Sequence, residues 1–74
     1  MTDNASDFTM KRMAQAVLRH CSPTEQQLIA QVVCDEPLRM TLMLNSAEGQ
    51  RFTDVEIAAF ILQCARRIKA GPIA

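Results

Sequence analysis

Cysteine and histidine are the side chains in this sequence that are best suited to binding a metal. Cys21, Cys34, Cys64 and the single histidine, His20, would together make a complete tetrahedral zinc set. Structural zinc sites usually take two ligands from a short spacing such as Cys-x-x-Cys, and no such spacing occurs here. The sequence therefore predicts no metal site. We expect the cysteines to act as small buried apolar residues and His20 to have a structural place near a helix C-terminus.

A catalytic group is equally hard to assemble. Nucleophilic catalysis needs a nucleophile, a base and a group that orients the base, and one histidine leaves little choice of base. The sequence has no Gly-x-Ser-x-Gly, no glycine-rich phosphate loop and no His-Glu-x-x-His. Its two glycines, Gly49 and Gly71, are explained by a turn and by a helix stop. We therefore expect a protein that is not an enzyme and that binds no cofactor.

The charge balance argues against nucleic acid as the main partner. Eight basic and eight acidic residues give a formal net charge of zero, whereas proteins that neutralise phosphates usually carry an excess of Lys and Arg. Basic residues nevertheless gather on the outer face of the first predicted helix and at the end of the last one. They are Lys11, Arg12 and Arg19 in the first set and Arg66, Arg67 and Lys69 in the second. If the two sets meet in space, they would form a patch for an acidic partner.

The compartment is predicted from cysteine use and from the absence of targeting patterns. An odd number of scattered cysteines is typical of reduced thiols in a cytosolic protein. Residues 1–8 lack the basic start and apolar core of a signal peptide. The longest unbroken apolar run, 57–62, is too short to cross a bilayer. We expect a cytoplasmic protein with no membrane association.

Hydrophobic periodicity predicts an all-α fold, a compact bundle of about four helices. The expected helices cover roughly 7–21, 23–34, 37–45 and 54–70. Residues 7–71 would form a single helical domain between a flexible tail at 1–6 and a C-terminal tail at 72–74.

Helix starts are marked by capping residues. Ser22 with Glu25, and Thr53 with Glu56, have the spacing of a capping box, in which the cap hydroxyl and the Glu carboxylate each bind a free backbone N–H. Ser6 is the expected cap of the first helix. The segment at 38–44 is ambiguous, because its apolar residues also alternate as in a strand. A lone strand would have nothing to pair with, so we expect a helix there.

The apolar faces are wider than a small bundle needs. In the last helix, apolar residues fill an arc of roughly 220°, about twice the width that a surface helix requires. The expected core contains Met13, Val17, Leu28, Val32, Leu42, Ile57, Ile61, Cys64 and Ile68. The surplus on the second, third and fourth helices, in a chain of only 74 residues, predicts self-association, most simply a twofold homodimer.

These observations favour a small protein–protein interaction module, a regulator or inhibitor that occupies a surface of a larger protein. Methionines are common both in cores and on adaptable binding surfaces, and charged rims guide partners. The candidate partner-binding residues are Arg12, Arg19, Met40, Met43, Phe60, Leu62, Arg66 and Arg67. The alternative is a small dimeric helix-turn-helix regulator of DNA. Its recognition helix, 37–45, would offer only Arg39 and Thr41 to base edges.

Overall fold

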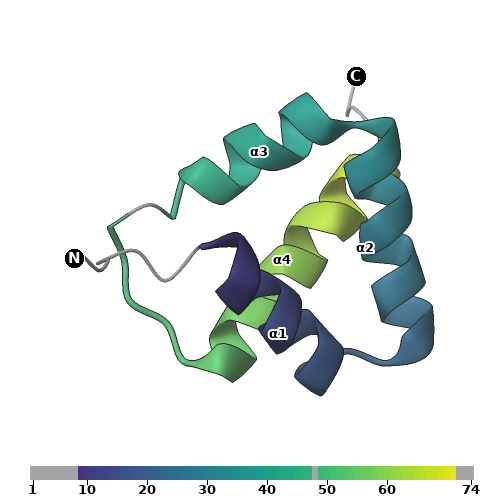
Figure 1. Ribbon diagram of the computed structural model, residues 1–74. Coiled ribbons are helices and arrows are strands. Elements are labelled where there is room, and N and C mark those ends of the chain that lie inside the picture. Colours follow the sequence, from purple (N-terminus) through teal and green to yellow (C-terminus); the bar gives the residue numbers. More distant parts are fainter. Residues whose placement is uncertain (1–8, 48, 72–74) are drawn as a thin grey trace.

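Four helices and their connections make up the structure. A computed structural model describes residues 9–47 and 49–71. Its elements are α1 (Met10–His20), α2 (Pro23–Asp35), α3 (Pro37–Asn45) and α4 (Asp54–Lys69), and the described residues contain no strand (Figure 1). The predicted all-α bundle is therefore confirmed, including the helical choice for residues 38–44. The predicted tails at 1–6 and 72–74 lie outside the described residues.

Both predicted capping boxes are present. The Ser22 hydroxyl accepts from the Glu25 N–H at 3.2 Å, and the Glu25 carboxylate accepts from the Ser22 N–H at 2.8 Å. Thr53 and Glu56 exchange the same two bonds at 3.3 and 2.8 Å. Each box satisfies two N–H groups that have no partner within the helix, so α2 and α4 begin where the sequence predicts.

The first helix begins later than predicted. Thr9 is its cap, and the Thr9 hydroxyl accepts from the Arg12 N–H at 3.2 Å. α1 therefore starts at Met10 and not at residue 7. The predicted cap, Ser6, lies outside the described residues. Either Ser6 or Thr9 could be the N-cap, because the hydroxyl of each can accept from the backbone N–H three residues later. The spacing of the residues therefore did not show which of the two is the cap.

The last helix ends as the sequence predicts. Gly71 adopts a positive φ of 86°, a conformation that costs glycine little, and its N–H donates to the Ile68 carbonyl at 3.0 Å. The Ala70 N–H donates to the Arg66 carbonyl at 2.9 Å. These bonds satisfy carbonyls that the end of the helix would otherwise leave open.

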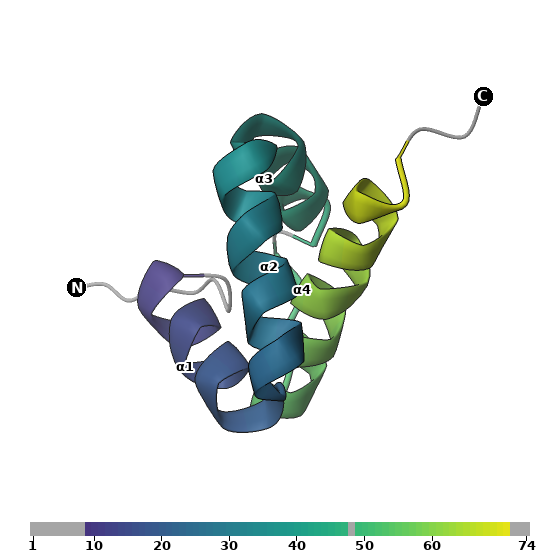
Figure 2. The same cartoon turned by 90° about the vertical axis from the view of Figure 1, so that its right-hand side faces the viewer.

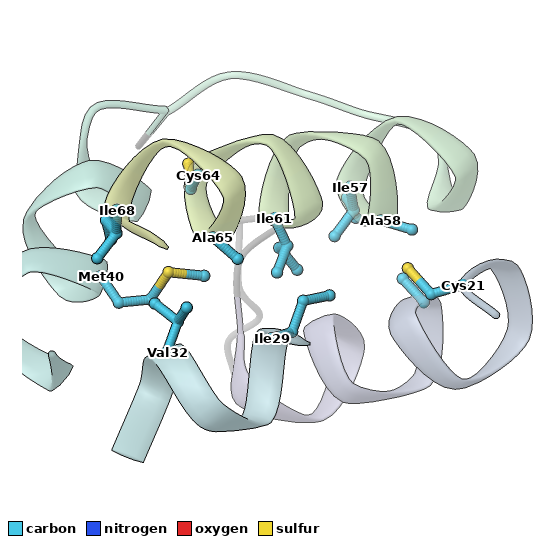
Figure 3. Close-up of a cluster of buried hydrophobic side chains, with 11 residues drawn as sticks. Cys21, Ile29, Val32, Met40, Ile57, Ala58, Ile61, Cys64, Ala65 and Ile68 are labelled. Atoms are coloured by element: carbon cyan, nitrogen blue, oxygen red, sulfur yellow. The ribbon is translucent and has the colours of Figure 1, made fainter. Parts of the chain in front are cut away.

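The helix α4 is the centre of the molecule. α1, α2 and α3 all pack on α4, and α2 also packs on α3. α1 and α2 are joined directly but diverge from their junction, as both views show (Figures 1 and 2). In Figure 3 the side chains of α2 and α3 point toward those of α4. The buried apolar set is Ala16, Cys21, Ile29, Val32, Met40, Ala47, Ile57, Ala58, Ile61, Cys64, Ala65 and Ile68.

The predicted core is right for α4 and partly wrong elsewhere. Leu42 was expected inside and is 69% exposed, because α3 turns Met40 toward the core in its place. Met13, Val17 and Leu28 are only partly buried against the core. Several buried residues that the prediction left out are alanines, which allow helices to approach closely but give a weak hydrophobic signal.

Candidate functional site

The described residues form an apolar groove. It has a volume of about 1010 Å³ and lies between α1, α2 and α3. Its floor is formed by core side chains of three different helices, Ile29, Met40 and Ile61. A volume of this size is at the upper end of what binding sites for small molecules occupy, about 300–1,000 Å³.

One wall of the groove is the apolar stripe of α1. The stripe consists of Met10, Met13, Ala14, Val17 and Leu18, spaced three and four residues apart so that they share one helix face. Met10 is 85% exposed and Leu18 is 67% exposed. The apolar face of α1 is therefore only partly covered, although its spacing is typical of a helix that packs one face against a hydrophobic surface.

The opposite walls have the same construction. On α2 the lining residues are Pro23, Gln26, Gln27, Ala30 and Val33, again three and four apart. On α3 they are Pro37, Thr41, Leu44 and Asn45. Each helix thus turns one continuous stripe toward the groove while a second face packs on α4. The groove is a product of the helix arrangement and does not depend on a loop.

An arginine fixes α1 to α4. The Arg12 guanidinium lies 3.2 Å from the Asp54 carboxylate and donates to the Phe52 carbonyl at 3.1 Å. Ala16, one turn further along α1, is fully buried, and its small side chain lets the two helices approach. This attachment holds α1 against α4 independently of α2.

The second wall is held to α4 by a different set of contacts. Ile29 and Val32 are buried, and Arg66 of α4 lies 3.5 Å from the Glu25 carboxylate. At the junction of the two walls, the Gln26 amide donates to the Cys21 carbonyl at 2.9 Å. Because α1 and α2 are anchored separately, the space between them is already open before any ligand arrives.

The groove interior is uncharged. Its polar lining side chains are Gln26, Gln27, Thr41 and Asn45, and no charged residue lines it. Lys11 and Arg19 lie outside it on α1, each one position after a residue of the apolar stripe, and both are exposed. At about 100° per residue, Lys11 is close in direction to Leu18, whereas Arg19 lies beside Arg12 on the side of α1 opposite the stripe. The groove is therefore an apolar cleft with Lys11 at the edge of its α1 wall.

The predicted partner-binding residues do not come together in one place. Met40 is in the groove floor, whereas Met43, Phe60 and Arg67 border a smaller hollow of about 530 Å³ between α3 and α4. The Phe60 ring stacks on that of Phe52, with centroids 6.0 Å apart.

The remaining predicted residues have separate surroundings. Arg12 and Arg66 are engaged in the ion pairs with Asp54 and Glu25, Arg19 is exposed on α1, and Leu62 is partly buried against the core. At the end of α4, Lys69 donates to the Gln31 side chain of α2 at 3.4 Å.

The thiols have two kinds of environment. Cys21 and Cys64 are buried as predicted, whereas Cys34 is exposed on α2, contrary to the expectation of a buried residue. Burial raises the pKa of the Cys64 thiol, and the nearby Arg67 opposes part of that rise. Among residues 9–47 and 49–71, no three His, Cys, Asp or Glu side chains are grouped closely enough to hold a metal ion.

Sequence reasoning missed most of the groove. It assigned Met13 and Val17 to the core, and its candidate partner-binding residues include none of the α2 residues that line the groove. The available signal was the narrow, strongly segregated stripe of α1, which fits one flat contact and not a central position.

Comparison with known proteins gives no relative: no protein-family model, no curated protein and no solved structure matches this chain. None of the described helices is both long enough and apolar enough to cross a bilayer.

Proposed function

We propose that this protein is a small, non-enzymatic protein–protein interaction module, and that its groove binds an amphipathic helix of a larger protein. By covering that helix the module acts as a regulator or inhibitor. The observation that carries the proposal is the open apolar stripe of α1, with Met10 and Leu18 largely exposed beside a groove that has no charged lining.

Covering the exposed stripe would contribute free energy to binding. Burying a leucine or methionine side chain that was in water contributes about 1.5–3 kcal/mol. Single exposed apolar residues are common, but contiguous ones beside a cleft are typical of interaction sites. Met10, Leu18 and Val33 all border this one groove and are all exposed. An occupant would cover them together.

A helix is the segment that fits the groove best. Peptides that bind as strands need an exposed sheet edge for their backbone hydrogen bonds, and residues 9–47 and 49–71 contain no strand. A helix satisfies its own backbone and offers side chains at three- and four-residue spacing. From Met10 to Leu18 the α1 wall is about 12 Å long at 1.5 Å per residue, which matches about two to three turns of a bound helix.

Three further expectations accompany the proposal. Free thiols, one of them exposed, suit a reducing compartment such as the cytoplasm. The homodimer expected from the surplus apolar surface stays a prediction. DNA binding is supported only by the order of α2 and α3, because the exposed face of α3 includes Leu38 and Leu42, which cannot form hydrogen bonds with base edges.

Fluorescence polarisation with a designed peptide tests the proposal. The probe is an amphipathic helix of about 16 residues, uncharged on its flanks, with leucines three and four positions apart. We expect it to bind, and we expect Ala30→Glu to weaken binding strongly, because that substitution places a carboxylate in the apolar wall. The control is Ala59→Glu, at an exposed position of α4 that does not line the groove.

The experiment has clear contrary outcomes. A scrambled peptide of the same composition lacks the apolar stripe and is expected not to bind. Equal binding of the scrambled peptide, or equal loss with Ala30→Glu and Ala59→Glu, would contradict the groove as the binding site. Circular dichroism of both variants verifies that each remains folded, which is expected because both positions are exposed.

A further inference from the structure

We infer that two copies of this chain pair through the outer face of α4, with the two α4 helices antiparallel about a twofold axis. The residues of this outer face are Glu56, Phe60, Gln63 and Arg67. The inference gives the expected homodimer a defined interface. It does not depend on the proposed function, because the groove lies elsewhere, between α1, α2 and α3.

The residues of the outer face share one side of α4. Their spacing is four, three and four residues, and at about 100° per residue their directions fall within about 60° of one another. Glu56, Gln63 and Arg67 are exposed, and Phe60 is half-buried. The six buried residues of α4 lie on the other side of the helix, which the rest of the molecule covers. The outer face is therefore the side of α4 that is open to another molecule.

Opposite charges lie at the two ends of the outer face. Glu56 and Arg67 are separated by about three turns of helix, or about 16 Å along the axis, and by only about 20° of rotation. The Arg67 guanidinium makes no ion pair within residues 9–47 and 49–71. One carboxylate oxygen of Glu56 accepts from the Thr53 N–H at 2.8 Å, which leaves the other oxygen for a second donor. Each end of the face can therefore form an ion pair with another molecule.

Antiparallel pairing brings these opposite charges together twice. A twofold axis that passes between residues 61 and 62 places Glu56 of each copy opposite Arg67 of the other copy. The same axis places Phe60 opposite Gln63. A parallel pair would instead bring each charge against its own counterpart, and like charges in contact oppose association. The formal net charge of zero adds no overall repulsion between two copies. The charges of α4 thus complement a second copy of α4 in the antiparallel arrangement.

The hollow between α3 and α4 provides apolar surface beside these charges. Its lining includes Leu42 and Met43 of α3 together with Phe60, Gln63 and Arg67 of α4. Leu42 is 69% exposed, and a second α4 that lies along the outer face would cover this leucine as well. Burial of apolar surface that the single chain leaves in water favours association. The ion pairs set the direction of the second helix, and the hollow contributes the apolar contact.

Sedimentation equilibrium of two charge-reversed variants, alone and mixed, tests the inference. In a dimer of Arg67→Glu, two carboxylates face each other at each end, and in a dimer of Glu56→Arg two guanidinium groups do so. We expect each variant alone to dimerise about tenfold more weakly than the unmodified protein. Mixed in equal amounts, the two variants should form a heterodimer, because each end then combines one arginine with one glutamate. The gain on mixing should shrink in about 1 M salt, where the screening length falls to about 3 Å.

The mixture also controls for effects inside one chain. Glu56→Arg removes the carboxylate of the α4 capping box, and a second chain cannot restore that bond. Recovery of dimerisation on mixing would therefore come from charges that meet across the interface. Arg19→Glu is the control for net charge, since it makes the same change as Arg67→Glu at an exposed position of α1. It should leave the dimer affinity unchanged. Circular dichroism verifies that each variant remains folded.

Two further variants separate this inference from the proposed function. Ala59→Glu adds a carboxylate on the exposed side of α4 and should weaken the dimer while the groove still binds the probe peptide. Ala30→Glu should have the opposite effects. An unmodified protein that stays monomeric at high concentration, or a mixture of Arg67→Glu and Glu56→Arg that is no more dimeric than either variant alone, would overturn the inference. A dimer lost in Ala30→Glu but kept in Arg67→Glu would place the interface in the groove and would also overturn it.

Discussion

Lys11 and Arg12 are adjacent cations on α1 with different surroundings. Arg12 lies over α4, where its guanidinium contacts the Asp54 carboxylate and the Phe52 carbonyl. Lys11 is one residue, or about 100°, further round the helix and stays exposed. Arg12 therefore positions the α1 wall of the groove, whereas the Lys11 side chain remains in solvent. Sequence reasoning grouped both with one outer basic face, because adjacency in the chain does not show which of the two turns toward a neighbouring helix.

Replacing Arg12 should loosen α1. Arg12→Met keeps an unbranched chain but removes the ion pair and the bond to the carbonyl. The pair is about 40% exposed on both sides, so solvent screens it, and we expect a loss of about 1 kcal/mol in the free energy of unfolding. Urea denaturation measures the change. Lys11→Met is the control and should change stability much less. A loss of similar size in both variants would contradict the assigned role of Arg12.

The free energy of unfolding should fall at alkaline pH because of the buried Cys64 thiol. A thiol in the unfolded chain has a pKa of about 8.5. At a pH below this value, the Cys64 thiol is protonated in both the folded and the unfolded protein. Burial raises the pKa of Cys64 in the folded state, so the unfolded chain releases its proton first as the pH rises. The stability from this group is therefore full below the unfolded pKa and is lost as the pH rises toward the folded pKa. Denaturation between pH 7 and 10 measures the decline.

Two single substitutions provide the comparison for the alkaline decline. Cys64→Ala should make the fall of stability with pH shallower, whatever its effect at pH 7. Burial also raises the pKa of Cys21, with a smaller contribution from Glu25, so some decline should remain. Cys34→Ala removes an exposed thiol and should leave the decline as it is. An identical pH dependence in all three proteins would be evidence against this account of the buried thiol.

At the scale of the helices, local signals were predictable from the sequence and placement was not. The two capping boxes and the Gly71 end rest on residues a few positions apart, so their chemistry is complete within the sequence. The exposure of Leu42 and the open stripe of α1 depend on where α2 and α3 lie relative to α4. A hydrophobic pattern shows which face is apolar, but it does not show whether a neighbour covers that face.

The cap of α4 is expected to contribute measurably. Thr53→Ala removes the hydroxyl that accepts the Glu56 N–H and should cost about 1 kcal/mol. For a domain of this size, that loss lowers Tm by about 4–8 °C. Thr24→Ala is the matched control, since Thr24 is exposed in the first turn of α2 but is not its cap. Equal melting temperatures for Thr53→Ala and the unmodified protein would show that the capping bonds do not stabilise α4.

At the scale of the molecule, α4 organises both the core and the groove. The other three helices pack on α4, which contributes six of the buried residues. The divergence of α1 and α2 leaves an apolar groove between them. A chain of 74 residues buries a modest share of its surface, so a partner that fills the groove would also stabilise the fold. The sequence predicted surplus apolar surface on the second, third and fourth helices. Large apolar residues are exposed on each of these and also on α1, where the surplus was not expected.

Methyl NMR of the complex with the uncharged amphipathic probe peptide is the most direct test of the groove as a helix site. The account predicts intermolecular contacts from the peptide leucines to the methyl groups of Met10, Leu18 and Val33, on two walls of the groove, with few contacts to Val55 on α4. Contacts centred on Val55, or on Leu38 and Leu42 of α3, with the groove methyl groups unchanged, would contradict it.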